Sequence, residues 1–339
     1  MKKNQSFGSF DIFIKKAQAH SNKIIVLPEG EEDRIIDACN LAVENNICQI
    51  SLIGRRDKIL PKLSKKAASQ VEIIDLSKSD RVKSYYRDEL YKLRKEKGMT
   101  IEEAEKLVNN NIYFAMMMLK NGDADGVVAG AITHTADVLR PAFQIIKTKP
   151  GISKASSSFI LEVPKEYGEK GFMVFADCAV NERPTPEELA GIAISSAETA
   201  KKLVGVKPKV ALLSYSTNAD EDDKKLSPEV ARIKDTYKLV RRMDSTLDVI
   251  GEIQADAAII ESVGRLKFPG NSLAGRANTL IFPDLNSGNI AYKLVSKLGG
   301  LKAAGPLIQG LNKPVNDLSR SASAEEIFLT IALTVVQSI

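Results

Sequence analysis

Short apolar runs alternate along this chain with longer segments in which apolar residues recur every three or four positions. Apolar runs occur at 23–27, 49–53 and 71–76, and an amphipathic helical pattern covers 33–44. Two adjacent valines mark a further buried strand at 126–129. Because strands separated by helices are typical of a parallel sheet, the pattern predicts an α/β fold with helices layered on the sheet.

A pair of helices is predicted before the strand at 126–129, over 82–97 and 101–121. The first ends at a glycine, and Thr100 with Glu103 forms a capping box at the start of the second. Arg94 falls in the last turn of the first helix. A basic residue there compensates the helix dipole, so spacing alone assigns it no further role.

The alternation resumes after a polar linker at 147–154, whose Pro-Gly pair makes it the best candidate for a domain boundary. Thr185 precedes a proline at the first helical position and a glutamate two residues beyond that, which marks a helix start. The predicted strands are 158–163, 171–176, 210–214, 249–252 and 279–282, and the predicted helices are 185–203, 227–243 and 289–298.

Composition narrows the class of protein. The chain has 339 residues, 44% of them hydrophobic, which is enough for two domains with their own cores. Its net charge is only +5 and its basic residues are interleaved with acidic ones, so we expect small anionic substrates and no nucleic acid. Three cysteines without a C-x-x-C pair argue against a disulfide scaffold, and with two histidines they argue against a structural zinc site. No uncharged run is long enough to span a membrane, so we expect a cytoplasmic protein.

A polar stretch at 310–326 carries the most complete set of reactive groups in the chain. It lies before an apolar helix predicted at 327–336, and Ser323 with Glu326 forms a capping box at the start of that helix. The free N–H groups and the positive dipole end of the helix favour an anion there. The reactive groups are those of Asn316, Asp317, Ser319, Arg320, Ser321, Ser323, Glu325 and Glu326.

Two interpretations of this stretch remain open on spacing alone. In the first, Asn316 and Asp317 form a turn, the capping box serves only the helix, and the Arg320 side chain lies in solvent. In the second, the stretch binds an anionic substrate and transfers a proton, with the amide of Asn316 among the substrate-binding groups.

The sequence motif K-P-V-N-D-L-S-R at 313–320 resembles the signature of the phosphate acetyltransferase (phosphotransacetylase) family. Further segments agree with the family in the same order from about residue 23 to the end of the chain, which makes the resemblance specific. They are L-P-E-G-E-E-D-R at 27–34, L-R-K-E-K-G-M-T at 93–100, A-D-G-V-V-A-G-A at 124–131, H-T-A-D-V-L-R-P at 134–141, F-A-D-C-A-V-N at 175–181, G-E-I-Q-A-D-A-A at 251–258, A-G-R-A-N-T-L-I-F-P-D-L at 274–285 and Q-G-L at 309–311.

The resemblance implies a reversible reaction in which acetyl-CoA and inorganic phosphate give acetyl phosphate and CoA. CoA and acetyl-CoA would be substrates, and no bound cofactor or metal is implied. The implied fold has two three-layer α/β/α lobes with a cleft between them, like that of isocitrate and isopropylmalate dehydrogenases. The first domain would comprise 1–149 and, by return of the C-terminal helix, 305–339. The second, 150–304, would join two subunits into a homodimer.

For individual residues, the resemblance implies that Arg94 and Arg140 bind substrate and that Ser319 and Arg320 are catalytic. The general base of the family falls on Glu326, and here the chain departs from the family pattern. The family reads S-R-G-x-S-x-x-D, whereas this chain reads S-R-S-A-S-A-E-E. Glutamate performs the same proton transfer with its carboxylate one methylene further out.

Two other regions bear on the substrate. Lys297, near the end of a predicted helix, matches a basic position that similar enzymes use toward CoA. The segment 219–226 is acidic where similar proteins carry a Gly-Ser-Ala-Lys-like turn. Carboxylates repel a nearby phosphate group. We therefore expect Asp220–Asp223 to point into solvent, or the substrate contacts of this loop to differ from those of similar proteins.

The implied reaction requires a base, because a thiol with a pKa of about 8–9 is mostly protonated at neutral pH. We expect Glu326 to take the thiol proton, while Ser319 and Arg320 stabilise the developing negative charge. Arg94 and Arg140 would hold phosphate through their forked guanidinium groups.

Alternatives remain open at this point. A covalent route would use Cys178 as the acyl carrier, although its apolar neighbours are typical of a packing residue. Decarboxylating hydroxyacid dehydrogenases share the layout, but a G-x-G-x-x-G fingerprint after a strand is missing from the sequence. A non-catalytic relative would bind acyl-CoA as a sensor. Propionyl or butyryl could also replace acetyl, because one methylene changes selectivity by only about 1–3 kcal/mol.

Overall fold

The structure is a computed structural model that describes residues 8–219 and 226–339. The chain divides into two compact units, one made of Met1–Lys147 with Leu311–Ile339 and the other of Thr148–Gly310. The C-terminal segment therefore completes the first unit. Most of the acidic segment 219–226 lies outside the described residues. This includes Asp220–Asp223, which were expected to point into solvent.

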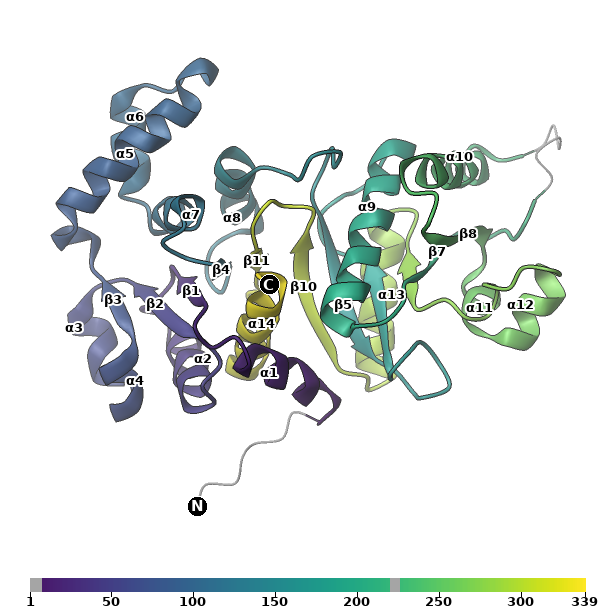
Figure 1. The fold of residues 1–339 in the computed structure, drawn as a ribbon, viewed down its shortest axis with the longest axis horizontal. Coiled ribbons are helices and arrows are strands. Elements are labelled where there is room, and N and C mark those ends of the chain that lie inside the picture. The colour runs from purple at the N-terminus through teal and green to yellow at the C-terminus, as the bar shows by residue number, and fades with distance from the viewer. Residues whose placement is uncertain (1–7, 220–225) are drawn as a thin grey trace. The chain divides into compact units, whose positions relative to one another are not determined.

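The first unit is built on a five-stranded sheet in which all neighbouring strands are parallel, in the order β11-β4-β1-β2-β3. Figure 1 shows α2 and α14 on one side of this sheet and α7 and α8 on the other. The strands are β1 (Ile24–Leu27), β2 (Gln49–Ile53), β3 (Glu72–Ile74), β4 (Gly126–Ala129) and β11 (Val315–Asp317). The helices are α1 (Asp11–Gln18), α2 (Asp33–Glu44), α3 (Arg56–Ile59), α4 (Lys65–Gln70), α5 (Asp80–Arg94), α6 (Ile101–Val108), α7 (Asn111–Asn121), α8 (Thr135–Pro141) and α14 (Ala324–Gln337).

Three neighbouring strands form the centre of this sheet and run in register. Val26 of β1 pairs with Val127 of β4, and Val127 pairs with Val315 of β11. All three valines are fully buried. Because the strands are parallel, their carboxyl ends reach the same edge of the sheet, where the connecting loops meet.

The predicted helix over 101–121 is wrong in one respect, because the structure breaks it into α6 and α7. The side chain of Asn110 accepts hydrogen bonds from the N–H groups of Ile112 and Tyr113 and so caps a new helix. An asparagine side chain competes with the backbone for these donors, which favours a cap over a helix interior. The predicted capping box of Thr100 and Glu103 is confirmed at the start of α6.

The second unit contains a six-stranded mixed sheet in the order β10-β5-β6-β9-β7-β8. The predicted adjacent strands β5 and β6 are confirmed as an antiparallel pair in which Phe159 faces Phe175. The strands are β5 (Ser156–Glu162), β6 (Phe172–Ala176), β7 (Lys209–Leu213), β8 (Asp248–Ile253), β9 (Thr279–Ile281) and β10 (Ala303–Gln309). The helices are α9 (Pro186–Thr199), α10 (Pro228–Met243), α11 (Ala255–Ile259), α12 (Glu261–Lys267) and α13 (Leu285–Leu298).

Both faces of this second sheet are covered, as the side-chain alternation along its strands demonstrates. Leu280 packs in one cluster with residues of α11, whereas its neighbour Ile281 packs in another with residues of α9. Leu212 and Leu213 of β7 divide between the same two clusters. Because successive side chains of a strand point to opposite faces, each face has its own apolar layer.

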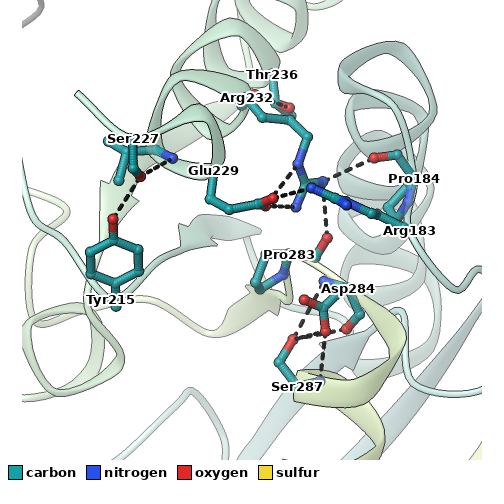
Figure 2. A network of polar contacts seen from close by, with 11 residues as sticks. Arg183, Pro184, Tyr215, Ser227, Glu229, Arg232, Thr236, Pro283, Asp284 and Ser287 are labelled. Atoms are coloured by element: carbon teal, nitrogen blue, oxygen red, sulfur yellow. Dashed lines mark hydrogen bonds and ion pairs between the residues drawn. The ribbon is translucent and has the colours of Figure 1, made fainter. Parts of the chain in front are cut away.

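One guanidinium group fastens α10 to two loops of this unit (Figure 2). Arg232 donates hydrogen bonds to the carbonyl oxygens of Pro184, 2.9 Å away, and Pro283, 3.1 Å away. Its charge is balanced by Glu229, which also accepts from Arg183. Pro184 and Pro283 follow β6 and β9, so this contact fixes the loops at the carboxyl ends of two neighbouring parallel strands.

Candidate active site

Most of the predicted site residues lie in the first unit, in or beside loops that leave the carboxyl ends of β1, β4 and β11. The loop after β1 carries Glu29, the loop after β4 spans 130–134, and the loop after β11 carries Ser319 and Arg320. These strands are neighbours in the order β11-β4-β1. Ligands of open parallel sheets bind at this edge, so the loops form the candidate site.

The loop after β4 is folded around a carboxylate. Glu29, which is 7% exposed, accepts hydrogen bonds from the N–H groups of four consecutive residues, Gly130, Ala131, Ile132 and Thr133, at 2.8–3.0 Å. Successive N–H groups that converge in this way form a concave site for negative charge. The protein's own glutamate fills it and fixes the backbone that leads to His134.

Arg34 links that loop to the loop after β11. Its guanidinium group donates to the carbonyl oxygens of Ala131 at 3.0 Å, Arg320 at 2.8 Å and Ala322 at 3.0 Å. The same side chain also forms an ion pair with Glu32 at 2.6 Å. A planar fork with several donors suits such a bridge between separate segments.

Asp317, at the end of β11, is a buried carboxylate of the same edge. It is 3% exposed, and its Oδ2 accepts a hydrogen bond from the Thr135 hydroxyl at 2.6 Å. Its Oδ1 is buried without a hydrogen-bond donor in the part of the chain that the structure describes. Burial raises the pKa of Asp317 to about 6, the nearby charge of Glu29 adds to this rise, and the Thr135 hydroxyl and the Arg320 charge oppose it.

Gly130 permits this arrangement. A Cβ atom at residue 130 would lie 2.3 Å from Oδ1 of Asp317, and the glycine has a φ of +105°, which other residues rarely adopt.

Ser319 and Arg320 form an exposed turn directly after the buried strand β11. The hydroxyl oxygens of Ser319 and Ser321 are 2.9 Å apart, and Ser319 also accepts from the Ser321 N–H group. Nη1 of Arg320 lies 3.1 Å from Nδ1 of His134, the residue that precedes α8. The turn thus presents hydroxyl and guanidinium donors side by side at the surface, which suits an anionic ligand.

The predicted capping box at the start of α14 is confirmed. The Ser323 hydroxyl accepts from the Glu326 N–H group at 3.2 Å, and Oε2 of Glu326 accepts from the Ser323 N–H group at 2.9 Å. Glu326 is exposed. Its carboxylate is therefore at the surface at the start of α14, where one of its oxygens serves the helix cap.

Arg94 and Arg140, the two arginines predicted to bind substrate, both lie near Tyr113. Burial raises the pKa of the Tyr113 hydroxyl, and the positive charges of Arg140 and Arg94 oppose this rise. Arg140 is exposed on α8, where Asp137 lies 3.4 Å from it. Nε of Arg94 is buried with no acceptor among residues 8–219 and 226–339, which is uncommon for a buried donor.

Asn316 does not face the site, and its predicted contact with substrate requires correction. The residue is 0% exposed, and its amide donates to the Thr334 hydroxyl at 2.7 Å and to the Gln337 side chain at 2.6 Å. Both partners lie on α14. Asn316 therefore joins β11 to the terminal helix, which is a structural role.

Lys297 lies in the second unit and is exposed in the last turn of α13. A lysine in that turn complements the negative end of the helix dipole. Its contact with CoA stays a prediction.

Comparison with known proteins decides the family. The family model described as phosphate acetyl/butaryl transferase matches residues 9–335. The chain belongs to this family. It is 47% identical to the phosphate acetyltransferase of Thermoanaerobacterium thermosaccharolyticum, over 96% of this chain and 98% of that protein. It is 46% identical to the phosphate acetyltransferase of Clostridium acetobutylicum, over 93% of this chain and 94% of that protein.

A solved structure agrees with the sequence relatives. A phosphotransacetylase from Streptococcus pyogenes matches with a TM-score of 0.87 and 38% identity, over 98% of this chain and 99% of that one. The α/β fold with two mostly parallel sheets, the predicted family and the predicted phosphate acetyltransferase activity are thereby confirmed. No helix in the described part of this family member is both long and apolar enough to cross a membrane.

The covalent alternative through Cys178 does not fit the geometry. The thiol is 0% exposed, and burial raises its pKa well above the ordinary value, with the nearby charge of Asp177 acting in the same direction. A thiol must become a thiolate to attack an acyl group, and this environment opposes that step. Cys178 is therefore a packing residue of the family member's second unit.

Sequence reasoning assigned no role to Glu29, Arg34 or Thr135. All three lie within segments that resemble the family, at 27–34 and 134–141, so the signal was present. Their partners are loops up to 288 residues away along the chain, which no local pattern identifies. Asp317 was noted only as a carboxylate or a turn residue, whereas the structure buries it at the end of a strand.

The raised pKa of Asp317 predicts a pH-dependent stability. An aspartate in the unfolded chain has a pKa of about 3.9, so the folded state holds this proton more tightly between pH 4 and 6. The contribution of Asp317 to the free energy of unfolding is therefore lost as pH rises through about 6. Between pH 5 and pH 7.5 we expect this loss to be roughly 1–2 kcal/mol.

This loss of unfolding free energy is measured by urea denaturation of the parent and of the Asp317→Asn variant at pH 5 and at pH 7.5. The variant removes the titrating group and keeps an oxygen that accepts from Thr135. Its unfolding free energy should fall less than that of the parent over this pH interval. Identical pH dependences in the two proteins would show that Asp317 does not titrate as described.

Proposed function

We propose that this phosphate acetyltransferase works through the exposed turn of Ser319 and Arg320, with Glu326 as the general base. In the proposed step a CoA thiolate attacks the carbonyl carbon of acetyl phosphate. The C–S bond forms, the bond between the carbonyl carbon and the phosphate oxygen breaks, and inorganic phosphate leaves. The thiol proton passes to the base. The observation that carries this proposal is that the exposed turn is followed, at the start of α14, by a glutamate whose side chain is also exposed.

The donors near the turn support distinct roles. Arg320 and Ser319 are exposed and free to stabilise negative charge on the carbonyl oxygen or the departing phosphate. Arg94 and Arg140 share the surroundings of Tyr113, and the unused Nε donor of Arg94 suits a phosphate oxygen. We assign these two arginines to the binding of acetyl phosphate and of inorganic phosphate.

A second candidate for the base is Asp317. Its pKa of about 6 lies close to physiological pH, which is the range that favours efficient proton transfer. Against it, the carboxylate is only 3% exposed and one oxygen is held by Thr135. Glu326 is exposed and remains the proposed base.

The activity is tested by mixing the protein with acetyl phosphate and CoA and following thioester absorbance. We expect thioester formation that requires both substrates and exceeds the rates with propionyl and butyryl phosphate. Binding of CoA without thioester formation would instead indicate a sensor. A faster rate with the longer acyl phosphates would overturn the assignment of acetyl as the preferred group.

We also propose a cytoplasmic homodimer that forms through α13. Ile290, Leu294 and Leu298 are spaced by four residues, lie on one face of the helix, and are 56%, 51% and 83% exposed. An exposed apolar row of this kind marks an interaction surface. A second copy of the chain supplies a matching row when the two subunits are related by a twofold axis.

Introduction of a charged side chain into this apolar row of α13 is expected to separate the two subunits. Leu294→Glu would place carboxylates against an apolar partner surface, so light scattering should report a monomer where the parent is a dimer. Val82→Glu on α5 is the matched control, because Val82 is also an exposed apolar helix residue, at 44% exposure. A dimeric Leu294→Glu variant would exclude α13 from the interface.

A further inference from the structure

Glu29 is bonded to one loop of the candidate site and Arg34 to both, through backbone groups of those loops. Both residues belong to the L-P-E-G-E-E-D-R segment, at the end of β1 and the start of α2. We propose that they are positioning residues, which set the spacing between the loop that leads to α8 and the turn of Ser319 and Arg320. The proposal rests on the function proposed above.

Glu29 holds the backbone donors of the loop after β4. Its two carboxylate oxygens each accept two N–H groups, Oε2 from Gly130 and Ala131 and Oε1 from Ile132 and Thr133. Four bonds to one buried carboxylate leave this backbone little freedom. Because α8 begins two residues after Thr133, the same bonds set the direction in which the helix leaves.

Arg34 holds the backbone acceptors. It is bonded to the carbonyl oxygen of Ala131 on one loop and to those of Arg320 and Ala322 on the other. Both backbone groups of Ala131 are therefore hydrogen-bonded. Its N–H group donates to Glu29, and its carbonyl oxygen accepts from Arg34. The guanidinium group acts as a spacer of fixed length between the loops.

The two loops carry the groups that the reaction needs. One leads through His134 into α8 and its Arg140, and the other presents Ser319 and Arg320. Displacement of a catalytic group by about 1 Å can lower a rate by about 10²-fold. Loss of the spacer should therefore impair the reaction although Arg34 touches no substrate.

The principal test is Arg34→Lys. Lysine keeps the charge but ends in a single ammonium group, which cannot span three carbonyl oxygens on two loops as a planar fork does. We expect kcat/KM for acetyl phosphate to fall about 10–100-fold, with a smaller change in KM for CoA. Glu29→Gln should act in the same direction, because the amide nitrogen cannot accept from the N–H groups that face it.

Arg55→Lys is the matched control. Arg55 makes an exposed ion pair with Glu31, next to the same segment, and bonds to neither site loop. Its variant should retain the kinetics of the parent. Addition of guanidinium ion to Arg34→Ala should restore part of the lost rate, which a role confined to global stability does not predict.

Phosphate affinity, measured by calorimetry on the same proteins, separates this proposal from the proposed reaction. If the parent binds phosphate but forms no thioester, the reaction is wrong, and weaker phosphate binding by Arg34→Lys still supports the positioning role. If Arg34→Lys matches the parent in both kinetics and phosphate binding, the positioning role is wrong. A parent that neither reacts nor binds phosphate refutes both.

Discussion

Replacement of Arg320 by alanine is expected to lower kcat for thioester formation by about 10²–10³-fold. The guanidinium group is exposed at the carboxyl edge of the first sheet, where it lies 3.1 Å from Nδ1 of His134. It is therefore placed to meet charge that develops on a ligand. Its loss should leave that charge poorly compensated in the transition state.

Initial rates with acetyl phosphate and CoA measure this effect, and thermal unfolding provides the structural control. The melting temperature should stay close to that of the parent, because the exposed side chain contributes little packing. Arg320→Lys should recover part of the rate, since it restores the charge but not the fork. An alanine variant with nearly parental kcat would remove Arg320 from the catalytic role.

Replacement of Glu326 by glutamine is expected to lower the rate in both directions by about 10²–10⁴-fold. Glutamine supports a capping box as glutamate does, so α14 should begin at the same residue. The variant therefore separates the two duties of this side chain. It retains the acceptor for the Ser323 N–H group and loses the base.

Asp317→Asn is the comparison that decides between the two carboxylates. If Asp317 were the base, the parent should lose activity as pH falls through about 6, and the asparagine variant should be the one without activity. If Glu326 is the base, Asp317→Asn should retain more activity than Glu326→Gln. Stability at each pH must be measured alongside, because Asp317 also affects unfolding.

The elements that the sequence predicted well are those with strong local signals. The helix start at Thr185 and Pro186 and the capping box at Ser323 depend on contacts within three residues, and both were found. Strand β11 was missed because Val-Asn-Asp is short and polar. It becomes a strand by pairing with β4 and by the bonds of Asn316 to α14, neither of which is visible locally.

The same distinction applies to the candidate site. Ser319, Arg320 and Glu326 lie in one continuous stretch, so the sequence was sufficient to propose them. Glu29 and Arg34 have partners about 100 to 290 residues away, and their importance follows from the parallel order of β11, β4 and β1. Parallel strands collect distant loops at one edge, and only the folded chain identifies which ones.

We infer that the exposed carboxylate of Glu326, at the start of α14, removes the thiol proton of CoA. The most direct test is the initial rate of thioester formation by the parent, Glu326→Gln and Asp317→Asn at one pH above 7, with all three proteins verified as folded. We predict that Glu326→Gln loses at least about 100-fold relative to the parent, and more than Asp317→Asn. A Glu326→Gln variant that is as fast as the parent would contradict the account.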